Sequence, residues 1–555
     1  MIGRRDFLRG SAVALGAGLL GPRIATKVFA AADAPCKIDI ALGESLGTIQ
    51  PEIYGHFIEH LGGVIYDGVW VGEKSPVPNV RGIRKALIDD LVAIKAPVIR
   101  WPGGCFADSY DWKDGIGPRA ARPTRTDFWA NDAQLRDKGN VPQAYDPNLF
   151  GTNEFIELCR AAGSEPYLAV NIRGLPALDF DRWVEYCNSP EGSTTLAQTR
   201  AAAGYPAPFN VRFWGVGNET WGCGGNFTPE DYASEFLRFT SWIPSFGLRP
   251  QLIASGPNGD DVDWTTKFLM RLAERGRAHL NSVYGLSMHH YASLNTATPP
   301  APAQKSDALQ FDEAGYFDLL KAGDKTEDYI LDHWKAMGEI DTDHKIKLIV
   351  DEWGPWYASG TEAVPTDLFG QQSTLRDAVF SAATLDIFNR NPEKVAMAAT
   401  AQLVNCLNSL FIAHGDKLVR TPVYHVFAMY AEHQAGQAVR TEFSAPNVSY
   451  QSAGQPAAFW GLNGSASIKG KELLLTVVNP DMHNARETQI DLGGAAVKSC
   501  RVTTLTSGDI HAHNTFEMPD ALTPTSQDLP LAASGASLHY TFAPASVTAL
   551  QITLA

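Results

Sequence analysis

The feature that most constrains the fold is an alternation of apolar, β-branched runs with helical patterns across residues 50–402. Eight of these runs have the length and composition of buried strands, at 53–57, 97–101, 166–171, 211–219, 252–255, 285–289, 346–352 and 395–402. Eight strands alternating with helices are typical of a (β/α)8 TIM barrel. In that fold we expect active-site residues at the C-terminal ends of the strands.

Helical patterns lie between most of the strand candidates. Residues 83–94 place Ile83, Leu87, Leu91 and Ile94 at a spacing of three to four. A second helix is predicted to begin at Thr228 and Pro229, because an N-cap followed by Pro at the first helical position starts a helix. A third covers 373–388.

Beyond residue 437 the pattern changes to short β-rich runs separated by Gly, Pro, Asn and Ser, at 472–478, 488–492, 498–504, 537–542 and 546–554. This pattern predicts a C-terminal all-β sandwich over 437–555. The barrel domain is assigned to 33–436. Its first segment, 36–42, is itself strand-like and is a candidate to pair into the sandwich.

The N-terminus has the plan of an export signal. Arg4 and Arg5 precede an apolar run over 11–20 and small residues over 28–32. The Arg pair resembles a twin-arginine signal, so residues 1–32 are set apart from the fold and a bacterial periplasmic or secreted protein is expected. A membrane anchor is the alternative, but the apolar run falls short of the roughly 20 residues that span a bilayer. No other segment is long and apolar enough to cross a membrane, so no membrane partner is expected after signal removal.

Charge and cysteine usage exclude several classes of function. The formal charge of −15 disfavours a nucleic-acid partner, which requires a clustered basic surface. The seven cysteines are scattered, without a CxxC pair or a Cys/His cluster at metal spacing, so no metal site is expected. Their odd number leaves at least one free thiol unless chains pair, and the sequence does not decide which of them form disulfides.

The first chemical motif is the run FWGVGNETWG, in which an apolar strand ends at Asn218 and Glu219. A carboxyl at the end of a buried strand, beside Trp221, is partly desolvated and suits a general acid. Asn218 can hydrogen-bond a sugar hydroxyl next to the reacting carbon. The alternative is a glutamate that only caps a loop.

The second motif is LIVDEWGPWY, where another apolar strand runs into Glu352. Glu219 and Glu352 fall on the fourth and seventh predicted strands, which face one another across a barrel. Two carboxyl groups about 5–5.5 Å apart are what retaining glycoside hydrolysis requires. Either glutamate could instead serve as a structural partner of Arg100 or Arg173.

Together these motifs resemble glycoside hydrolase family 51, the α-L-arabinofuranosidases. The resemblance spans the barrel in order and extends to the trailing sandwich. It is carried by IYGHFIEHLG from residue 53, RWPGGCFAD from 100 with Tyr110, Trp112 and DGIGP from 114, GNETWGCGG from 217, DEW from 351 with Trp356 and Tyr357, and AQLVN from 401.

The resemblance implies a role for each site residue. Glu219 is expected to be the acid/base and Glu352 the nucleophile. Residues expected to bind the arabinofuranosyl group are Glu59, Cys105, Asn218, Trp221, His289, Tyr291 and Gln402. Cys105 stands where some members have Asn, and His289 could hydrogen-bond the nucleophile or be an ordinary strand-end histidine. His290 should point away, because successive strand residues face opposite sides.

The expected reaction is a double displacement by an exo-acting enzyme on arabinose-containing plant oligosaccharides or polysaccharides. Glu352 attacks the anomeric carbon while Glu219 protonates the leaving oxygen and then activates water, so no cofactor is expected. The alternatives are another retaining barrel glycosidase, such as an endo-glucanase or xylanase, and a non-catalytic carbohydrate-binding protein. The first is disfavoured by Glu59 and the Arg100 segment, and the second by the presence of both carboxylates. The preferred polymer and the oligomeric state are not given, although members of this family often form homo-oligomers.

Overall fold

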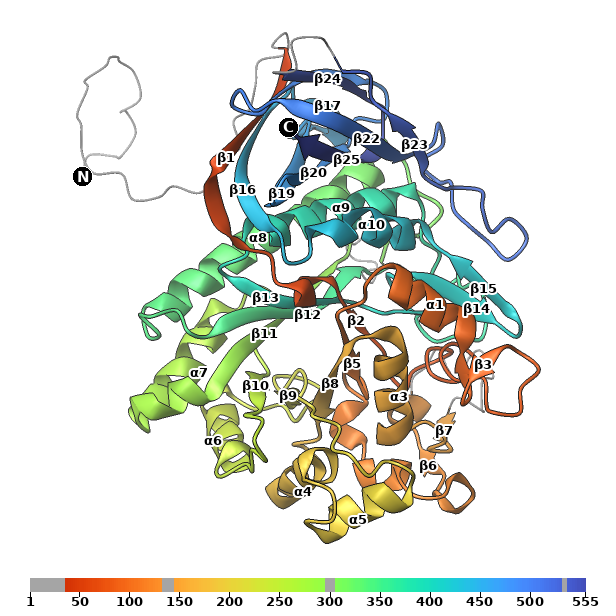
Figure 1. Ribbon diagram of the computed structural model, residues 1–555, viewed down its shortest axis with the longest axis vertical. Coiled ribbons are helices and arrows are strands. Elements are labelled where there is room, and N and C mark those ends of the chain that lie inside the picture. The colour runs from red at the N-terminus through yellow and green to blue at the C-terminus, as the bar shows by residue number, and fades with distance from the viewer. Residues whose placement is uncertain (1–34, 132–143, 295–304, 532–536) are drawn as a thin grey trace, which may run out of the picture.

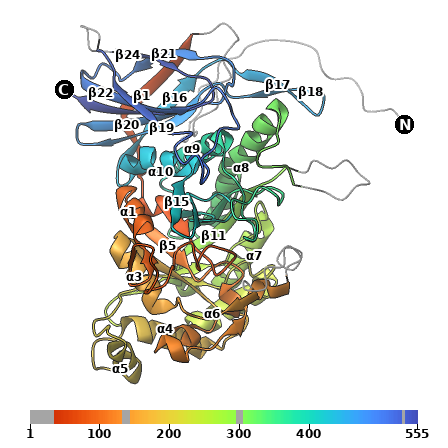
Figure 2. The same ribbon diagram turned by 90° about the vertical axis from the view of Figure 1, so that its right-hand side faces the viewer.

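The computed structural model describes residues 35–131, 144–294, 305–531 and 537–555. The export signal predicted over 1–32 lies outside these residues. The described chain forms a barrel surrounded by helices and, stacked on one side of it, a β-sheet domain (Figure 1). The same two parts stand one above the other in the perpendicular view (Figure 2).

Eight parallel strands close into a barrel in the order β10-β11-β12-β13-β2-β5-β8-β9. This arrangement confirms the predicted (β/α)8 fold. The strands are β2 Gly55–Phe57, β5 Val98–Trp101, β8 Glu165–Val170, β9 Phe213–Val216, β10 Gln251–Ala254, β11 Val283–Ala292, β12 Lys347–Pro355 and β13 Val395–Thr400.

Two strands are shorter than predicted, for local reasons. The run at 53–57 begins as the 3-10 turn Pro51–Tyr54, so that only Gly55–Phe57 joins the barrel. The run at 211–219 ends at Val216, because Gly217 has a φ of +83° and leaves the extended conformation. As a result Glu219 lies on a turn beyond the strand and not on the strand itself.

The helices follow the predicted alternation. Thr228 caps α6 by accepting a hydrogen bond from the Asp231 N–H, as its position before Pro229 predicted. The pattern over 83–94 is divided between the short strand β4 Ile83–Arg84 and α1. The helices are α1 Lys85–Ala93, α3 Thr152–Ala162, α4 Ala177–Asn188, α5 Thr195–Ala202, α6 Pro229–Thr240, α7 Val262–Glu274, α8 Glu313–Gly338, α9 Leu375–Arg390 and α10 Pro422–Tyr430.

Alternate strand residues build two separate cores. One cluster fills the barrel with inward-facing side chains, which include Val98, Tyr167, Phe213, Ile253 and Ile349. The outward-facing residues join a much larger core between strands and helices. Because both faces of each strand are buried, the strands read in the sequence as nearly continuous apolar runs. In the described part of the chain, no helix has the length and apolarity needed to cross a membrane.

The second part is a nine-stranded sheet in the order β23-β22-β25-β20-β19-β16-β1-β21-β24. Strands from opposite ends of this order share one core, and Thr504 of β22 is hydrogen-bonded to Tyr540 of β24, so the sheet curls over on itself like a sandwich. Its strands are β1 Cys36–Thr48, β16 Gln437–Ser444, β19 Asn463–Lys469, β20 Glu472–Asn479, β21 Arg486–Asp491, β22 Val497–Thr506, β23 Thr525–Asp528, β24 Ser537–Phe542 and β25 Ser546–Leu554.

Strand β1 lies between β16 and β21, so the chain contributes to the sheet before it enters the barrel. Four hairpins or strand pairs complete the description: β3 Asn79–Val80 with β4, β6 Arg125–Thr126 with β7 Tyr145–Asp146, β14 Phe411–His414 with β15 Lys417–Arg420, and β17 Val448–Ser452 with β18 Gln455–Phe459. The domain boundaries 33–436 and 437–555 stay predictions.

Buried polar contacts join the two parts. Asp386 of α9 accepts hydrogen bonds from Ser465 of β19 at 2.6 Å, Thr476 of β20 at 2.7 Å and Tyr430 of α10 at 2.9 Å. Burial raises the pKa of Asp386 to about 6, although these three donors favour its charged form. The contacts therefore attach the sheet to helices that pack on the barrel.

Candidate active site

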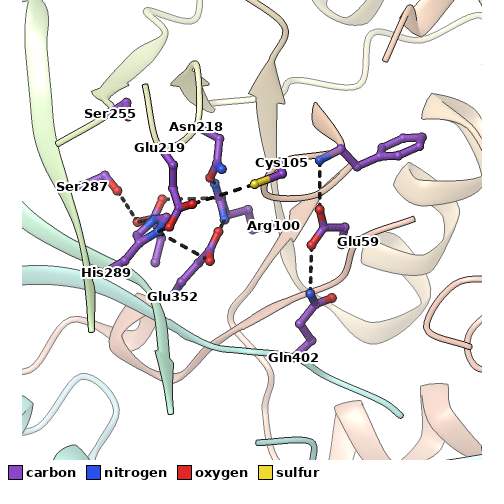
Figure 3. A network of polar contacts seen from close by, with 12 residues as sticks. Glu59, Arg100, Cys105, Asn218, Glu219, Ser255, Ser287, His289, Glu352 and Gln402 are labelled. Carbon is purple, nitrogen blue, oxygen red and sulfur yellow. Dashed lines mark hydrogen bonds and ion pairs between the residues drawn. The ribbon is translucent and has the colours of Figure 1, made fainter. Parts of the chain in front are cut away.

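The sequence-predicted site residues gather at one end of the barrel. Glu352, His289 and Tyr291 lie in the last part of β12 and β11, whereas Glu219 and Gln402 lie just beyond β9 and β13. Glu59, Cys105, Asn218 and Trp221 follow the ends of β2, β5 and β9. Figure 3 shows most of these side chains pointing toward one another.

Glu352 is held on both carboxylate oxygens. Arg100 of β5 donates to Oε1 at 2.7 Å, and the Tyr291 hydroxyl donates to Oε2 at 2.8 Å. Burial opposes the charge of Arg100, but Asp351 and Glu352 keep its pKa above the ordinary value, so it remains a cation. The structural alternative considered for the glutamates therefore holds in part, since Arg100 does pair with Glu352. Arg173 instead donates to the Asp108 carbonyl.

Glu219 sits on a turn whose backbone is fixed by other groups. Its φ is +40°, a conformation that a non-glycine residue adopts only under constraint. The buried carboxylate of Asp108 accepts a hydrogen bond from Asn218 N–H at 2.9 Å and from two amides after β8, those of Ile172 and Arg173. Burial raises the pKa of Asp108 to about 7, and the three amides counteract that rise.

His289 lies between the two glutamates. Its Nδ1 is 2.9 Å from Glu219 Oε1 and 3.5 Å from Glu352 Oε2, and its Nε2 is 3.3 Å from Asp351 Oδ1. Burial would lower the pKa of His289, but the surrounding carboxylates, Glu352 first, raise it to about 10. The imidazole is therefore a cation at neutral pH. His290 points away as predicted and contacts Thr326 of α8 at 2.7 Å.

Asp351 connects the cations of the site. It receives hydrogen bonds from Ser287 at 2.5 Å and Tyr167 at 2.8 Å, and its Oδ2 is 3.4 Å from Arg100 Nε. Burial would raise the pKa of Asp351, but Arg100 and His289 hold it well below its ordinary value. A single buried carboxylate thus orients both cations that contact the two glutamates.

Glu59 and Gln402 lie on the side of the site away from Glu219 and His289 (Figure 3). The Gln402 amide donates to Glu59 Oε2 at 3.0 Å, and the backbone N–H of Phe106 donates to Oε1 at 3.0 Å. Both side chains are almost fully buried, and Gln402 Oε1 has no hydrogen-bond partner. Burial and the nearby Glu352 raise the pKa of Glu59 to about 8. An unpaired buried acceptor beside a buried carboxyl is suited to hold hydroxyl groups of a ligand.

Cys105 departs from the expectation of a separate pocket residue. It forms a disulfide with Cys223, and the two sulfurs lie 3.8 and 3.7 Å from Glu219 Oε2. These are contacts and not donated hydrogen bonds, because a disulfide sulfur carries no proton. Asn218 is held by Arg100, whose Nη2 is 2.5 Å from its Oδ1. Trp221 is partly exposed at the edge of the core.

The two glutamates are close enough to act on one bond. One oxygen of each carboxylate and Nδ1 or Nε2 of His289 all lie within 4.8 Å of one another. The same three groups could hold a metal ion, which would have to displace the imidazole proton to bind His289. A second set, Cys105, Glu219 and Cys223, includes the disulfide and so lacks thiolates.

A cavity of about 290 Å³ opens beside Glu219 and His289. It extends over Asn258 after β10 toward Lys325 and Tyr329 of α8. This cavity lies on the Glu219 side of the site, whereas Glu59 and Gln402 line the other side. The site therefore has room for a group beside Glu219.

Sequence reasoning missed three residues of the site. Asp351 and Asp108 were read only as parts of motifs, and Arg100 only as a competing partner. Asp351 directly precedes Glu352 in the strand, so a buried carboxylate next to a candidate nucleophile was the available signal. Asp108 offered none, because its backbone contacts depend on how the loops after β5, β8 and β9 meet.

Comparisons with known proteins identify the family that this chain resembles. The family model described as "Alpha-L-arabinofuranosidase 1 domain" matches residues 90–301, and "Alpha-L-arabinofuranosidase C-terminal domain" matches 351–546. The "Intracellular exo-alpha-L-arabinofuranosidase" of Bacteroides ovatus is 33% identical over 90% of this chain and 92% of its own. The "Intracellular exo-alpha-(1->5)-L-arabinofuranosidase 1" of Bacillus subtilis is 28% identical over 72% and 76%. The crystal structure of the GH51 arabinofuranosidase from Xanthomonas axonopodis pv. citri has a TM-score of 0.84 and 32% identity, covering 93% of this chain and 100% of that one.

The expectation of a periplasmic or secreted protein is wrong by these comparisons. The relatives from B. ovatus and B. subtilis are both named intracellular, which contradicts export. The expectation rested on an Arg pair and a short Ala- and Gly-rich run. Such a composition is not specific to exported proteins, because a basic N-terminal segment rich in small residues has the same pattern whether or not it directs export.

Proposed function

The chain belongs to glycoside hydrolase family 51, the α-L-arabinofuranosidases, and on this premise we propose that it is a retaining, exo-acting enzyme with Glu352 as nucleophile and Glu219 as acid/base. The observation that carries the proposal is the pair of facing carboxylates, with oxygens within 4.8 Å. Retaining enzymes place their carboxyl groups about 5–5.5 Å apart, whereas inverting enzymes need about 6.5–9.5 Å to fit a water between them.

The environments of the two glutamates support this division of roles. Glu352 contacts a permanent cation, Arg100, at 2.7 Å and is held by the Tyr291 hydroxyl. These donors fix the position of both carboxylate oxygens, as a nucleophile requires. Glu219 contacts His289 through Oε1 at 2.9 Å, so Oε2 is the oxygen left to exchange a proton with the leaving group and with water.

The reaction then proceeds in two steps. Glu352 attacks the anomeric carbon while Glu219 transfers its proton to the glycosidic oxygen, which gives a covalent arabinosyl-enzyme and frees the leaving group. Ionised Glu219 next takes a proton from water, and that water attacks the same carbon. The bond to Glu352 breaks, and arabinose leaves with the configuration of the substrate.

The two sides of the site support exo action. Glu59, Gln402 and Asn218 offer acceptors and donors in a buried wall that suits the hydroxyls of one terminal arabinofuranosyl group. The cavity beside Glu219 suits the leaving group, because a general acid must contact the leaving oxygen. We propose arabinose-containing plant oligosaccharides and polysaccharides as substrates. The names of both relatives, which include exo action, support the proposal of exo action.

The test compares 4-nitrophenyl α-L-arabinofuranoside with the corresponding xyloside and glucoside and follows the arabinose product by proton NMR before it mutarotates. We expect turnover of the arabinofuranoside and a first product with retained α configuration. Turnover of the glucoside alone would favour an endo-glucanase-like enzyme, and an inverted first product would contradict the double displacement.

A further inference from the structure

The Cys105–Cys223 disulfide joins two rim loops that are 118 residues apart in sequence. Cys105 belongs to the loop after β5, which also carries Asp108. Cys223 belongs to the loop after β9, which carries Glu219. The bond therefore ties the loop that carries Glu219 to the neighbouring loop. Figure 3 shows Cys105 facing Glu219.

The loop after β9 has little regular support of its own. Gly217, Glu219 and Gly225 have φ values of +83°, +40° and +137°, so no strand ladder or helix fixes them. Backbone hydrogen bonds within the loop, such as Gly222 N–H and Gly224 N–H to the Glu219 carbonyl, form its turns. Contacts to the rest of the barrel include Asp108 on the Asn218 amide, Arg100 on the Asn218 side chain, Ser255 Oγ on the Thr220 amide at 3.2 Å, and the disulfide. The disulfide is the covalent member of this set.

The disulfide also determines what faces the proton-carrying oxygen of Glu219. Oε1 is occupied by His289, whereas Oε2 faces both sulfurs at 3.7 and 3.8 Å. Oxidised sulfurs cannot donate a hydrogen bond. Reduction would place two thiol donors next to Oε2, the oxygen that has to exchange a proton with the substrate. The same reaction would release the loop.

Accessibility separates this pair from four of the five free cysteines in the described residues, and place in the fold separates it from the fifth. Cys105 and Cys223 are partly exposed, while Cys159, Cys187, Cys406 and Cys500 are buried. Cys36, the remaining free thiol, is half-buried on β1 in the sheet domain. A soluble reductant thus meets the disulfide at the open end of the barrel.

We propose that the Cys105–Cys223 disulfide is a redox-modified site that positions Glu219, so that the oxidised enzyme is competent in the acid step and a dithiol reductant switches that step off. The exchange is balanced: a dithiol gives two electrons and two protons, the S–S bond becomes two thiols, and the reductant becomes a cyclic disulfide. This inference rests on the proposed role of Glu219 as acid/base.

The experiment measures kcat/KM for phenyl and 2,4-dinitrophenyl α-L-arabinofuranosides before and after treatment with dithiothreitol. Mass spectrometry after thiol alkylation confirms reduction of the pair. We expect at least a roughly tenfold loss with the phenyl substrate, which needs protonation of its leaving oxygen, and little loss with the dinitrophenyl substrate. Removal of the reductant and reoxidation should restore the rate.

Two variants keep the test decisive. The double variant Cys105→Ser/Cys223→Ser should show the reduced enzyme's substrate dependence and no response to dithiothreitol. Cys36→Ser, far from the site, should respond as the wild type does. Equal losses on both substrates, or no loss after confirmed reduction, would overturn the proposal. Glu219→Ala is assayed in parallel to tell the two failures apart. If this variant lacks leaving-group dependence, the acid/base assignment itself fails; if it shows that dependence while confirmed reduction changes nothing, only the redox inference fails.

Discussion

Glu219 and Glu352 differ in how the fold holds them. Glu352 lies within β12, where its backbone pairs with His289 of β11, and its side chain is only 7% exposed. Glu219 lies on an irregular turn beyond β9, and its side chain is 19% exposed. The regular strand suits a nucleophile that must stay charged and fixed. The turn suits a group that must exchange a proton with a leaving oxygen and then with water.

The two cations that contact the glutamates, Arg100 and His289, share one carboxylate partner, Asp351. Arg100 holds Glu352, His289 contacts both glutamates, and Asp351 contacts both cations. The disulfide and the contact of Asp108 with the Asn218 amide, by contrast, act on the loop that carries Glu219. The nucleophile therefore depends on charge pairing, and the acid/base depends on charge pairing and on a braced loop.

The largest effect is expected from Glu352→Ala. Loss of the nucleophile should lower kcat/KM on every aryl α-L-arabinofuranoside by on the order of 10⁴-fold or more, whatever the leaving group, because no covalent intermediate can form. Steady-state kinetics measure it. Glu352→Gln, which keeps the shape, serves as the matched control and should be equally inactive. A rate near that of the wild type in either variant would contradict the assignment of Glu352 as the nucleophile.

Glu219→Ala should have a large effect that depends on the leaving group. We expect a loss of about 10²–10⁴-fold with a phenyl substrate, and a much smaller loss in the first step with 2,4-dinitrophenolate, which leaves without a proton. A plot of log kcat/KM against leaving-group acidity measures the difference. If kcat/KM fell by the same factor for every leaving group in both glutamate variants, the different roles assigned to Glu219 and Glu352 would be contradicted.

Asp351→Asn should lower kcat/KM by about 10²-fold, because it weakens the orientation of Arg100 and His289 together. Asp386→Asn is the control, since Asp386 is an equally buried carboxyl with three donors but lies at the sheet interface. It should lower the melting temperature and leave kcat/KM unchanged. If the two variants behaved alike, Asp351 would be a structural residue only.

The smallest effect concerns stability and pH. Because the folded-state pKa of Glu59 is raised from 4.5 to about 8, the proton that it holds stabilises the fold fully below pH 4.5, and this contribution is lost as pH rises through 8. Glu59→Gln has no charge to bury. Its stability relative to wild type should rise between pH 5 and 8 by on the order of a few kcal/mol and then level off. Thermal unfolding at pH 5, 7 and 9 measures it. A pH-independent difference would contradict the raised pKa.

The eight strands and the strand-end location of the site could be predicted because burial on both faces makes each strand an apolar run. Glu352 followed from such a run ending in a carboxylate. The end of this strand at Val216 was not placed, because a glycine at 217 fits either inside a strand or at its end, and the sequence does not show that Gly217 takes a positive φ.

The long-range contacts of the site could not be predicted from local patterns. The Cys105–Cys223 bond joins two loops without a spacing motif, and Asp108 acts through backbone amides that no side-chain pattern records. His289 was expected beside the nucleophile, yet it lies closer to Glu219 Oε1 than to Glu352 Oε2. The distance between His289 and Glu219 depends on how far the turn after β9 extends across the barrel.

The most direct measurement is the anomeric configuration of the azide product. In Glu219→Ala, azide can attack the arabinosyl-enzyme from the side that water normally uses, and proton NMR identifies the product. If Glu352 is the nucleophile, added azide should accelerate turnover of the dinitrophenyl substrate and yield the α-L-arabinofuranosyl azide, with retained configuration. Formation of the β azide by this variant, or no response to azide, would contradict the roles assigned to the two glutamates.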